Sequence, residues 1–258
     1  MDAAANLSRI AYHGSSAPTA ETLRALHRAH LLTVPFENLD IHLGVPIRLE
    51  EAALFQKIVA RNRGGFCYEL NGLFAALLHE LGFRVTVLNA LIPDSHNGCG
   101  MDFDHPILLV KLQERWIVDV GFGDACRLPL RLDERGEQMG VGVGYRISTD
   151  EDGRWRFWER LENGEWEFYY AFTLRPCLLS DFGEACRYYE TNPRSSFTQK
   201  RICSRATPDG HLSLTEGRLI RVRDGRKEET PLAGEAGFAL ALREHFDIAL
   251  DETIPNQE

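Results

Sequence analysis

The hydrophobic pattern of this chain changes at Arg84, and that change limits the possible folds more than any other feature. Before it, apolar residues recur three and four positions apart, which is typical of helices that bury one face. After it, Val85 and Val87 open a section in which apolar and polar residues alternate, as in half-buried strands. With 258 residues, the chain can form one large domain or two to three small ones. The predicted fold class is α+β, with helices first and antiparallel strands after them.

Three helices are predicted in residues 1–83, which we expect to form a helical domain. The first begins at Thr19, whose side chain would cap it, and the second covers about residues 50–61. The third opens at Cys67 and ends near Gly82, because glycine is common just after the end of a helix. Pro35 stops the first helix, so the short segment that contains it is predicted to form a turn.

Residues 84–177 are predicted to form an antiparallel β-barrel domain. Two apolar runs at 107–112 and 116–120 indicate a hairpin. Asp-Gly at 152–153 and Asn-Gly at 163–164 are hairpin turn signals that separate the later strands.

The end of the chain changes character again. Residues 178–199 are predicted to form an interdomain helix and a connection. Residues 200–258 combine short strands with a last helix at 237–246, so a second small α/β domain is expected there.

Composition and charge exclude several classes of protein. The net charge of −9 argues against a nucleic-acid-binding protein, which would present a basic face. No apolar run approaches the roughly 20 residues that cross a bilayer. The first ten residues lack the basic and apolar regions of a signal peptide. The six cysteines are scattered, so we expect reduced thiols in a cytoplasmic protein rather than a set of disulfides.

Cys67 carries the clearest chemical signal. It follows Gly64 and Gly65 and opens a helix, where unpaired N–H groups and the positive end of the helix dipole favour an anion. A thiol in that position is expected to be acidified toward the nucleophilic thiolate. The two glycines let the chain turn sharply and let a substrate approach the backbone. The alternative is a structural cysteine, since a buried free cysteine is usually inert.

His105 and Asp119 are the best candidates to assist such a nucleophile, which needs a base and a group that orients the base. His105 stands at the mouth of the apolar run that begins at residue 107. Asp119 lies between apolar neighbours on the partner strand, where an unpaired carboxylate is costly to bury. The hairpin would bring it within reach of His105. Asp102 and Asp104 are rival orienting groups, in a segment that is expected to be polar and solvated.

The other histidines and two further motifs carry less weight. The remaining histidines lie in helical, polar or turn contexts and are expected to be surface or core residues. His96 and Cys99 form a single His-x-x-Cys pair without a second pair, so no metal site is expected. The glycine-rich segment 140–144 does not connect a strand to a helix in a βαβ unit, so no nucleotide-binding loop is expected.

Several segments, in this order and spacing, resemble the arylamine N-acetyltransferase family. They are Pro-Phe-Glu-Asn-Leu at 35–39, Arg-Gly-Gly-Phe-Cys-Tyr-Glu-Leu-Asn-Gly-Leu-Phe at 63–74, His105, and Trp-Ile-Val-Asp-Val-Gly-Phe-Gly at 116–123. The string around Cys67 is highly specific, and the match covers about the first half of the chain. Asn-Pro-Arg-Ser-Ser-Phe-Thr at 192–198 resembles a further segment of the family, and the last third resembles it only in general layout.

The resemblance implies a Cys67–His105–Asp119 catalytic triad. It implies an α-helical first domain, a β-barrel second domain and an α/β lid, on a framework shared distantly with papain-like and transglutaminase-like enzymes. It also implies ping-pong transfer of an acetyl group from acetyl-CoA, without a metal, to arylamines, arylhydrazines or N-hydroxyarylamines. The residues expected to line the acceptor slot are Phe36, Phe122 and Phe197.

Two further expectations concern the surroundings of the triad. Glu37 and Arg63 are predicted to pair behind the nucleophile and to fix the turn before it. The family more typically has threonine before the catalytic histidine, and this chain has Asp104, which is expected to alter the pKa of His105.

Three alternatives use the same residues. A cysteine peptidase or amidase would share the triad but would lose its acyl group to water. An amide synthase of the same family would close a macrolactam without a CoA donor. A non-enzymatic relative could keep the fold as a binding module. The complete set of Cys, His and Asp argues against this alternative, because a binding module does not need all three.

Overall fold

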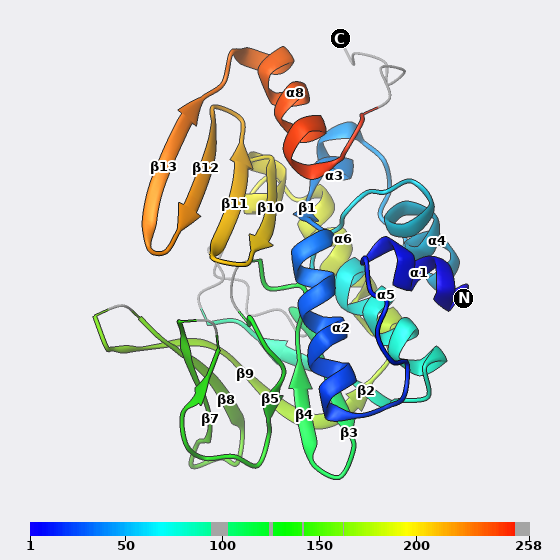
Figure 1. Cartoon of the computed structure of the whole chain (residues 1–258), viewed down its shortest axis with the longest axis vertical. Helices are drawn as coiled ribbons and strands as arrows, with labels where there is room; N and C mark the ends of the chain where they lie inside the picture. The colour runs from blue at the N-terminus through cyan, green and yellow to red at the C-terminus, as the bar shows by residue number, and fades with distance from the viewer. Residues whose placement is uncertain (94–102, 124–125, 141, 162, 251–258) are drawn as a thin grey trace.

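The computed structural model describes residues 1–93, 103–123, 126–140, 142–161 and 163–250. In this part of the chain helices come first, then a large antiparallel sheet, then a smaller sheet with a last helix (Figure 1). The α+β fold class predicted from the change of period is confirmed. His96, Cys99 and Asp102 lie outside the described residues.

The first helices surround α5, which holds the candidate nucleophile at its first residue. The helices are α1 (Ala3–Arg9), α2 (Ala20–Thr33), α3 (Leu39–Leu43), α4 (Glu51–Phe55), the π-helix η1 (Gln56–Ala60) and α5 (Cys67–Glu80). The Thr19 side chain accepts a hydrogen bond from the backbone N–H of Thr22, so the predicted cap of α2 is present. Gly82 has a φ of +83°, which glycine adopts at little cost after a helix.

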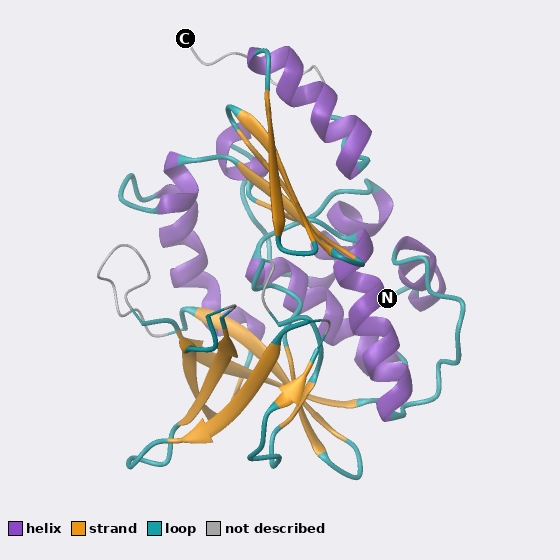
Figure 2. Cartoon of the chain, turned by 60° about the vertical axis from the view of Figure 1, so that its left-hand side comes forward, coloured by secondary structure: helices purple, strands orange, loops and turns teal. Residues whose placement is uncertain are grey.

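The large sheet is antiparallel and curls into a nearly closed barrel (Figure 2). Its described strands are β2 (Arg84–Leu91), β3 (His105–Lys111), β4 (Arg115–Val118), β5 (Leu130–Arg131), β6 (Gln138–Met139), β7 (Gly144–Thr149), β8 (Trp155–Arg160) and β9 (Trp166–Cys177). They lie in the order β5-β4-β3-β2-β9-β8-β7-β6. The predicted hairpin is formed by β3 and β4, in which Leu108 pairs with Val118. Asp119 follows the last residue of β4.

The smaller sheet has a member that the sequence did not predict. It contains β1 (Phe36–Glu37), β10 (Ile202–Thr207), β11 (Gly210–Thr215), β12 (Arg218–Arg223) and β13 (Arg226–Pro231), in that order. Helix α8 (Gly234–Phe246) packs Phe238 and Leu242 into the same core as Leu214. β1 was predicted to be part of a turn, and this was wrong. Its partner β10 is more than 160 residues away, so no local pattern could reveal the pairing.

The segment between the two sheets covers the start of α5. It contains the 3₁₀ helix η2 (Leu179–Phe182), α6 (Gly183–Thr191) and α7 (Ser196–Gln199). Phe182, Cys186 and Tyr189 from this segment are buried in one cluster with Phe66 and Cys67. The first residue of α5 is therefore enclosed by residues that are distant in the sequence.

The turn before α5 depends on a close approach between two backbones. Gly65 forms a bridge with Phe36, and the Glu37 N–H donates to the Gly65 carbonyl at 2.8 Å. A Cβ atom on Gly64 would lie 2.1 Å from the carbonyl oxygen of Pro35, so no larger residue fits there. The segment around Pro35 thus fixes where the chain enters α5.

Candidate functional site

Cys67 is the first residue of α5, and only 8% of its surface is exposed. Burial raises the pKa of its thiol well above the ordinary value, and Asp104, Cys186 and Asp119 raise it further. The backbone N–H of Tyr68 acts in the opposite direction. The expectation that the helix start alone would acidify this thiol is therefore wrong. A buried thiol whose pKa is raised needs a proton acceptor to become a thiolate.

His105 and Asp119 form a buried pair. The Nε2 atom of His105 lies 2.8 Å from Oδ2 of Asp119, and each residue is 2% exposed. The hairpin thus brings the two side chains together as its pairing predicts. Burial acts to raise the pKa of Asp119, but His105 and the hydrogen bonds from Asn71 and Gly121 outweigh it and lower that pKa. Asp119 is held as a carboxylate beside the imidazole.

Asn71 links the helix of Cys67 to this pair, and the sequence interpretation missed it. Its Nδ2 donates to the Pro106 carbonyl at 2.8 Å and to Oδ1 of Asp119 at 2.9 Å. Its Oδ1 accepts the N–H of Val120 at 3.0 Å. Asn71 lies four residues after Cys67, and residues at that spacing share one face of a helix. That spacing was the available signal.

Gly121 brings the chain after Asp119 against the nucleophile. A Cβ atom at this position would lie 2.8 Å from Cα of Cys67 and 2.7 Å from Nδ2 of Asn71. The N–H of Gly121 also donates to Oδ1 of Asp119 at 2.9 Å. Only glycine permits this approach, which packs the end of the hairpin on the first turn of α5.

Two other side chains support Asp119, and local sequence gave little sign of either. His27, which we expected to be a surface or core histidine, lies with Nε2 2.9 Å from the backbone carbonyl oxygen of Asp119. Burial lowers the pKa of His27 to about 4, so it is neutral at pH 7. Tyr170, on β9, has its ring 5.8 Å from that of His105 and stacks on Phe157 at 4.8 Å. Burial raises the pKa of Tyr170, and hydrogen bonds to Cys126 and Asp119 add to the rise.

Asp104, a rival orienting residue, is buried rather than solvated and does not take that role. It is 4% exposed, and its carboxylate accepts hydrogen bonds from the Tyr189 hydroxyl and from the Ile92 N–H. The hydroxyl of Tyr68 donates to its backbone carbonyl at 2.8 Å. Asp104 is buried because tyrosines from α5 and α6 donate hydrogen bonds to it. The polar sequence around Asp104 did not indicate this burial.

The three phenylalanines predicted to line an acceptor slot fall into two groups. Phe36 and Phe197 pack together at 6.1 Å between ring centroids and border the buried cluster that contains Cys67. Phe122 packs in the cluster of the large sheet, with its ring edge-on to His105 at 5.1 Å. All three are partly exposed.

A second polar cluster lies behind the first turn of α5. The predicted Glu37–Arg63 pair is present at 2.8 Å, and Arg63 also bonds Asp40 at 2.8 Å. Lys57 bonds Asp40 at 2.8 Å and Glu69 at 2.8 Å. Glu69 accepts the N–H of Phe66 at 3.1 Å and so caps the start of the helix. These five charged residues fix the position at which Cys67 enters α5.

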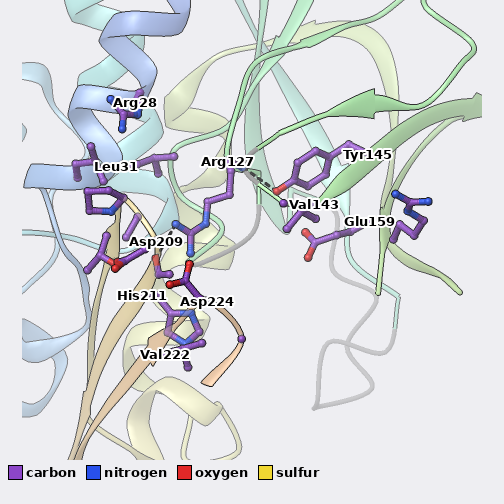
Figure 3. A pocket seen from close by; sticks show the side chains of 18 of the residues that line it. Arg28, Leu31, Arg127, Val143, Tyr145, Glu159, Asp209, His211, Val222 and Asp224 are labelled. Atoms are coloured by element: carbon purple, nitrogen blue, oxygen red, sulfur yellow. Dashed lines mark hydrogen bonds between the residues drawn. The ribbon is translucent and has the colours of Figure 1, made fainter. Parts of the chain in front are cut away.

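A cavity of about 870 Å³ lies between α2, the ends of β7 and β8, and the β10–β11 hairpin (Figure 3). Arg127 crosses it, donating its backbone N–H to the Tyr145 hydroxyl and its Nη1 to the Gly210 carbonyl. Basic and acidic side chains both line the cavity, so its charge does not favour an anionic ligand over a cationic one. Arg127, which lines the cavity, directly follows Cys126 in the chain. Sγ of Cys126 lies 3.9 Å from Oδ2 of Asp119.

Neither a metal site nor a membrane-spanning helix is found in the described part of the chain. Among the described residues, no group of three or more His, Cys, Asp and Glu side chains could hold a metal ion. In the same segments, no helix is both long and apolar enough to span a bilayer.

Comparison with known proteins gives one consistent result. A family model described as N-acetyltransferase matches residues 19–254. The chain is 34% identical to the pineal gland isozyme of arylamine N-acetyltransferase from Gallus gallus, over 98% of this chain and 96% of that protein. It is 36% identical to the arylamine N-acetyltransferase / N-hydroxyarylamine O-acetyltransferase of Salmonella typhimurium, over 91% of this chain and 84% of that protein.

Solved structures agree with these sequence matches. The arylamine N-acetyltransferase from Salmonella typhimurium superposes with a TM-score of 0.90 at 32% identity, covering 97% of this chain and 92% of that one. The Mycobacterium marinum arylamine N-acetyltransferase in complex with CoA superposes with a TM-score of 0.87 at 32% identity, covering 96% and 93%.

Proposed function

The chain belongs to the arylamine N-acetyltransferase family and is a transferase, and from that premise we propose that it moves an acetyl group from acetyl-CoA to an arylamine through an acetyl-Cys67 intermediate. The observation that carries the proposal is the buried His105–Asp119 pair at 2.8 Å, joined through Asn71 to the helix that begins at Cys67. A cysteine with an elevated thiol pKa becomes a nucleophile only when a base takes its proton.

In the first half-reaction, His105 removes the proton of Cys67. Its Nε2 is bonded to Asp119, so Nδ1 is the nitrogen that takes the proton. The thiolate attacks the thioester carbonyl of acetyl-CoA, the bond between that carbonyl carbon and the CoA sulfur breaks, and CoA leaves as a thiol with the proton that His105 had taken. Asp119 keeps the imidazole oriented and stabilises its positive charge. The acetyl group remains on Cys67.

In the second half-reaction, the amine attacks the carbonyl carbon of acetyl-Cys67 and His105 takes the amine proton. The bond between that carbon and Sγ of Cys67 then breaks, which releases the acetylated amine and leaves Cys67 as a thiolate beside the protonated His105. An arylamine is neutral at pH 7, so it needs no strong base to become nucleophilic. The backbone N–H of Cys67, in the first turn of α5, is the proposed donor to the oxyanion of both tetrahedral intermediates, with a second donor from residues 103–105. Phe36, Phe122 and Phe197 are the proposed contacts for the aromatic ring.

The acceptors proposed are arylamines, arylhydrazines and N-hydroxyarylamines. The name of the Salmonella typhimurium relative includes O-acetylation of N-hydroxyarylamines, which supports the last class. The Mycobacterium marinum relative has been solved in complex with CoA, which supports acetyl-CoA as the donor.

Two structural proposals accompany this function. The division into a helical domain, a barrel, a connection and an α/β lid follows the boundaries 1–83, 84–177, 178–199 and 200–258, on a framework shared distantly with papain-like and transglutaminase-like enzymes. A cytoplasmic location is proposed from the scattered cysteines, and those at 67, 126, 177, 186 and 203 are free thiols.

The test is release of free thiol from acetyl-CoA, with and without a simple arylamine, for the wild type and Cys67→Ala. Release that requires the amine, and that Cys67→Ala abolishes, is expected. Cys203→Ala is a matched control, because that cysteine is buried in the other sheet. Release that does not require an acceptor would indicate a hydrolase. No release from a protein whose Cys67 is still rapidly alkylated would indicate another acyl donor or amide synthesis.

A further inference from the structure

His27, on α2, is buried, and no step of the proposed reaction uses it. The buried residues beside it on the same helix include Leu23 and Leu26. An imidazole in such surroundings costs free energy that leucine would not cost, unless the ring makes a hydrogen bond. Its Nε2 lies 2.9 Å from the backbone carbonyl oxygen of Asp119, 92 residues further along the chain. The bond of this histidine therefore reaches the carboxylate residue of the proposed triad.

The acceptor determines which nitrogen of the His27 ring carries the proton. A carbonyl oxygen only accepts hydrogen bonds, so Nε2 is the protonated nitrogen. Burial lowers the pKa of the ring to about 4, so the ring is neutral at pH 7 and Nδ1 carries no proton. In the described part of the chain, Nδ1 has no hydrogen-bond partner. His27 thus acts as an N–H donor to the Asp119 carbonyl.

The peptide that joins Asp119 to Val120 lies just beyond the β3–β4 hairpin. The pairing of the two strands ends one residue before Asp119, so its carbonyl falls outside the ladder. Two helices hold this peptide from its two sides. His27 of α2 donates to its carbonyl oxygen, and Oδ1 of Asn71 on α5 accepts its N–H at 3.0 Å.

The carboxylate of Asp119 depends on that peptide for its position. Its Oδ1 accepts the N–H of Gly121 and Nδ2 of Asn71, both at 2.9 Å, and its Oδ2 bonds His105 at 2.8 Å. These partners hold the side chain, and none of them holds the carbonyl. Without the donor on α2 the peptide can rotate, and the carboxylate then moves relative to the imidazole. A base acts efficiently only while its orienting group keeps it in place.

His30, one turn further along α2, provides an internal comparison. It is buried like His27, and both rings lie edge-on to Phe74, at 6.4 Å between centroids for His27 and 5.2 Å for His30. Its Nε2, however, has no hydrogen-bond partner among the described residues. The two histidines share a helix, a depth of burial and a packing partner, and they differ in the bond to Asp119.

We infer that His27 is a positioning residue of the triad, whose Nε2–H holds the 119–120 peptide against α2 and thereby keeps the Asp119 carboxylate aimed at His105. Its action on the reaction passes through Asp119. The inference rests on the proposed function, which assigns His105 and Asp119 to the reaction. The effect falls on kcat rather than on KM, because the imidazole is held less well while the proposed substrate contacts stay unchanged.

The experiment compares three variants of the full chain. His27→Leu fills the space of the ring and removes the donor. His27→Gln replaces the ring with an amide whose nitrogen can donate to the same carbonyl. His30→Leu is the matched control, because it removes an equally buried ring from the same helix.

Two measurements are made on each variant. Steady-state acetyl transfer from acetyl-CoA to a simple arylamine gives kcat and KM, with the melting temperature recorded beside them. The rate of Cys67 alkylation by iodoacetamide against pH, with the modified residue identified by mass spectrometry, reports on the thiol and its imidazole without any acetyl transfer.

His27→Leu should lower kcat by about 3- to 10-fold, the rate equivalent of one neutral hydrogen bond, with each KM within about twofold of the wild type. A less well held carboxylate stabilises the imidazolium less, so the midpoint of the rising limb of alkylation should move up by roughly a few tenths of a pH unit. His27→Gln should regain most of the lost kcat. His30→Leu should keep the wild-type kcat and midpoint, whatever the change in its melting temperature.

Three results would overturn the inference. A wild-type kcat in His27→Leu would show that the donor is not needed. A loss in His30→Leu as large as in His27→Leu would show that kcat follows the packing of α2. A His27→Gln variant as slow as His27→Leu would show that the hydrogen bond is not what matters. If His27→Leu does not fold, His27→Asn replaces it, because its amide nitrogen lies where Nδ1 was, and a wild-type kcat in that variant rejects the inference.

The alkylation profile separates this inference from the proposed function. A raised midpoint in His27→Leu, when the wild type transfers no acetyl group, would reject the proposed function and support the role of His27. Acetyl transfer by the wild type with no loss in His27→Leu would reject the inference only.

Discussion

Two buried polar clusters meet at the first turn of α5, and they differ in how their charges are balanced. The charge cluster consists of Glu37, Asp40, Lys57, Arg63 and Glu69, and its cations each bond two carboxylates. The thiol cluster consists of Cys67, Asn71, Asp104, His105 and Asp119. There, two carboxylates lie near a thiol and raise its pKa, and one imidazole balances one of them. One cluster fixes the backbone, and the other is where the proposed reaction moves a proton.

The charge cluster is costly to build and costly to break. Burial acts against the charge of Lys57, but Glu69, Glu37 and Asp40 outweigh it and raise the pKa of the amine. Removing either cation would leave one buried carboxylate without its counterion, Glu69 for Lys57 and Glu37 for Arg63. The thiol cluster instead depends on hydrogen bonds to Asp119, so changes there are expected to affect the rate more than the fold.

The largest effect is expected from Asp119→Asn, which should lower kcat by roughly 10³- to 10⁴-fold, as loss of the orienting carboxylate does in other triads. The amide cannot stabilise an imidazolium, so His105 becomes a weaker base. Steady-state acetyl transfer and the melting temperature are the measurements. The control is Asp133→Asn, which removes an exposed carboxylate that forms an ion pair with Arg115. This variant should keep full activity. If the melting temperature of Asp119→Asn fell as far as that of a charge-cluster variant, the two clusters would not differ in their effect on stability, contrary to the expectation.

Next in size is Lys57→Met, which should lower the free energy of unfolding by about 3–5 kcal/mol. The side chain keeps its length and loses the charge, so Asp40 and Glu69 lose their shared cation. Denaturant unfolding measures the change. The acetyl transfer rate per folded molecule should change far less than in Asp119→Asn. A stability within about 1 kcal/mol of the wild type, on the scale of an exposed pair, would show that the cluster does not hold this turn.

A smaller effect concerns the pH dependence of stability. Burial, with Glu37 and Asp40, raises the pKa of Glu69 from its ordinary value to about 7, although Lys57 opposes the rise. The folded state then binds a proton more tightly than the unfolded state, so this contribution is complete below pH ~4.5 and is lost as pH rises through about 7. Glu69→Gln should flatten this fall, which amounts to at most about 3 kcal/mol. The measurement is the free energy of unfolding in urea at several pH values from 5 to 8. If it fell equally with pH in the wild type and in Glu69→Gln, the prediction would be contradicted.

The smallest effect is expected from Lys227→Met on β13. Lys227 lies 2.7 Å from Glu229, as close as Lys57 lies to its own carboxylates, but its side chain is 57% exposed. Water and salt screen such a pair, so the melting temperature should not change measurably. This variant matches Lys57→Met in chemistry and differs from it in burial. A large drop in melting temperature here would mean that distance, rather than burial, determines what an ion pair contributes.

Local sequence was enough to predict the elements that carry the site. The helical spacing from Leu70 to Leu81 predicted α5, and the two apolar runs predicted the β3–β4 hairpin. The hairpin register then placed Asp119 near His105, because antiparallel pairing fixes which residues face each other. The specific string around Cys67 indicated the family, and the comparisons confirm that membership.

The sequence by itself therefore determined the order of helices and strands, the position of Cys67 at a helix start and the placement of Asp119 within reach of His105. Only the tertiary structure decided the burial of Asp104, the support of Asp119 by His27 and Tyr170, and the pairing of β1 with β10. It also decided the direction of the pKa of Cys67, which a helix start should lower and burial raises. The reason is physical. Periodicity and hairpin pairing act over a few residues, whereas desolvation depends on every segment that packs around a group, and those segments come from the whole chain.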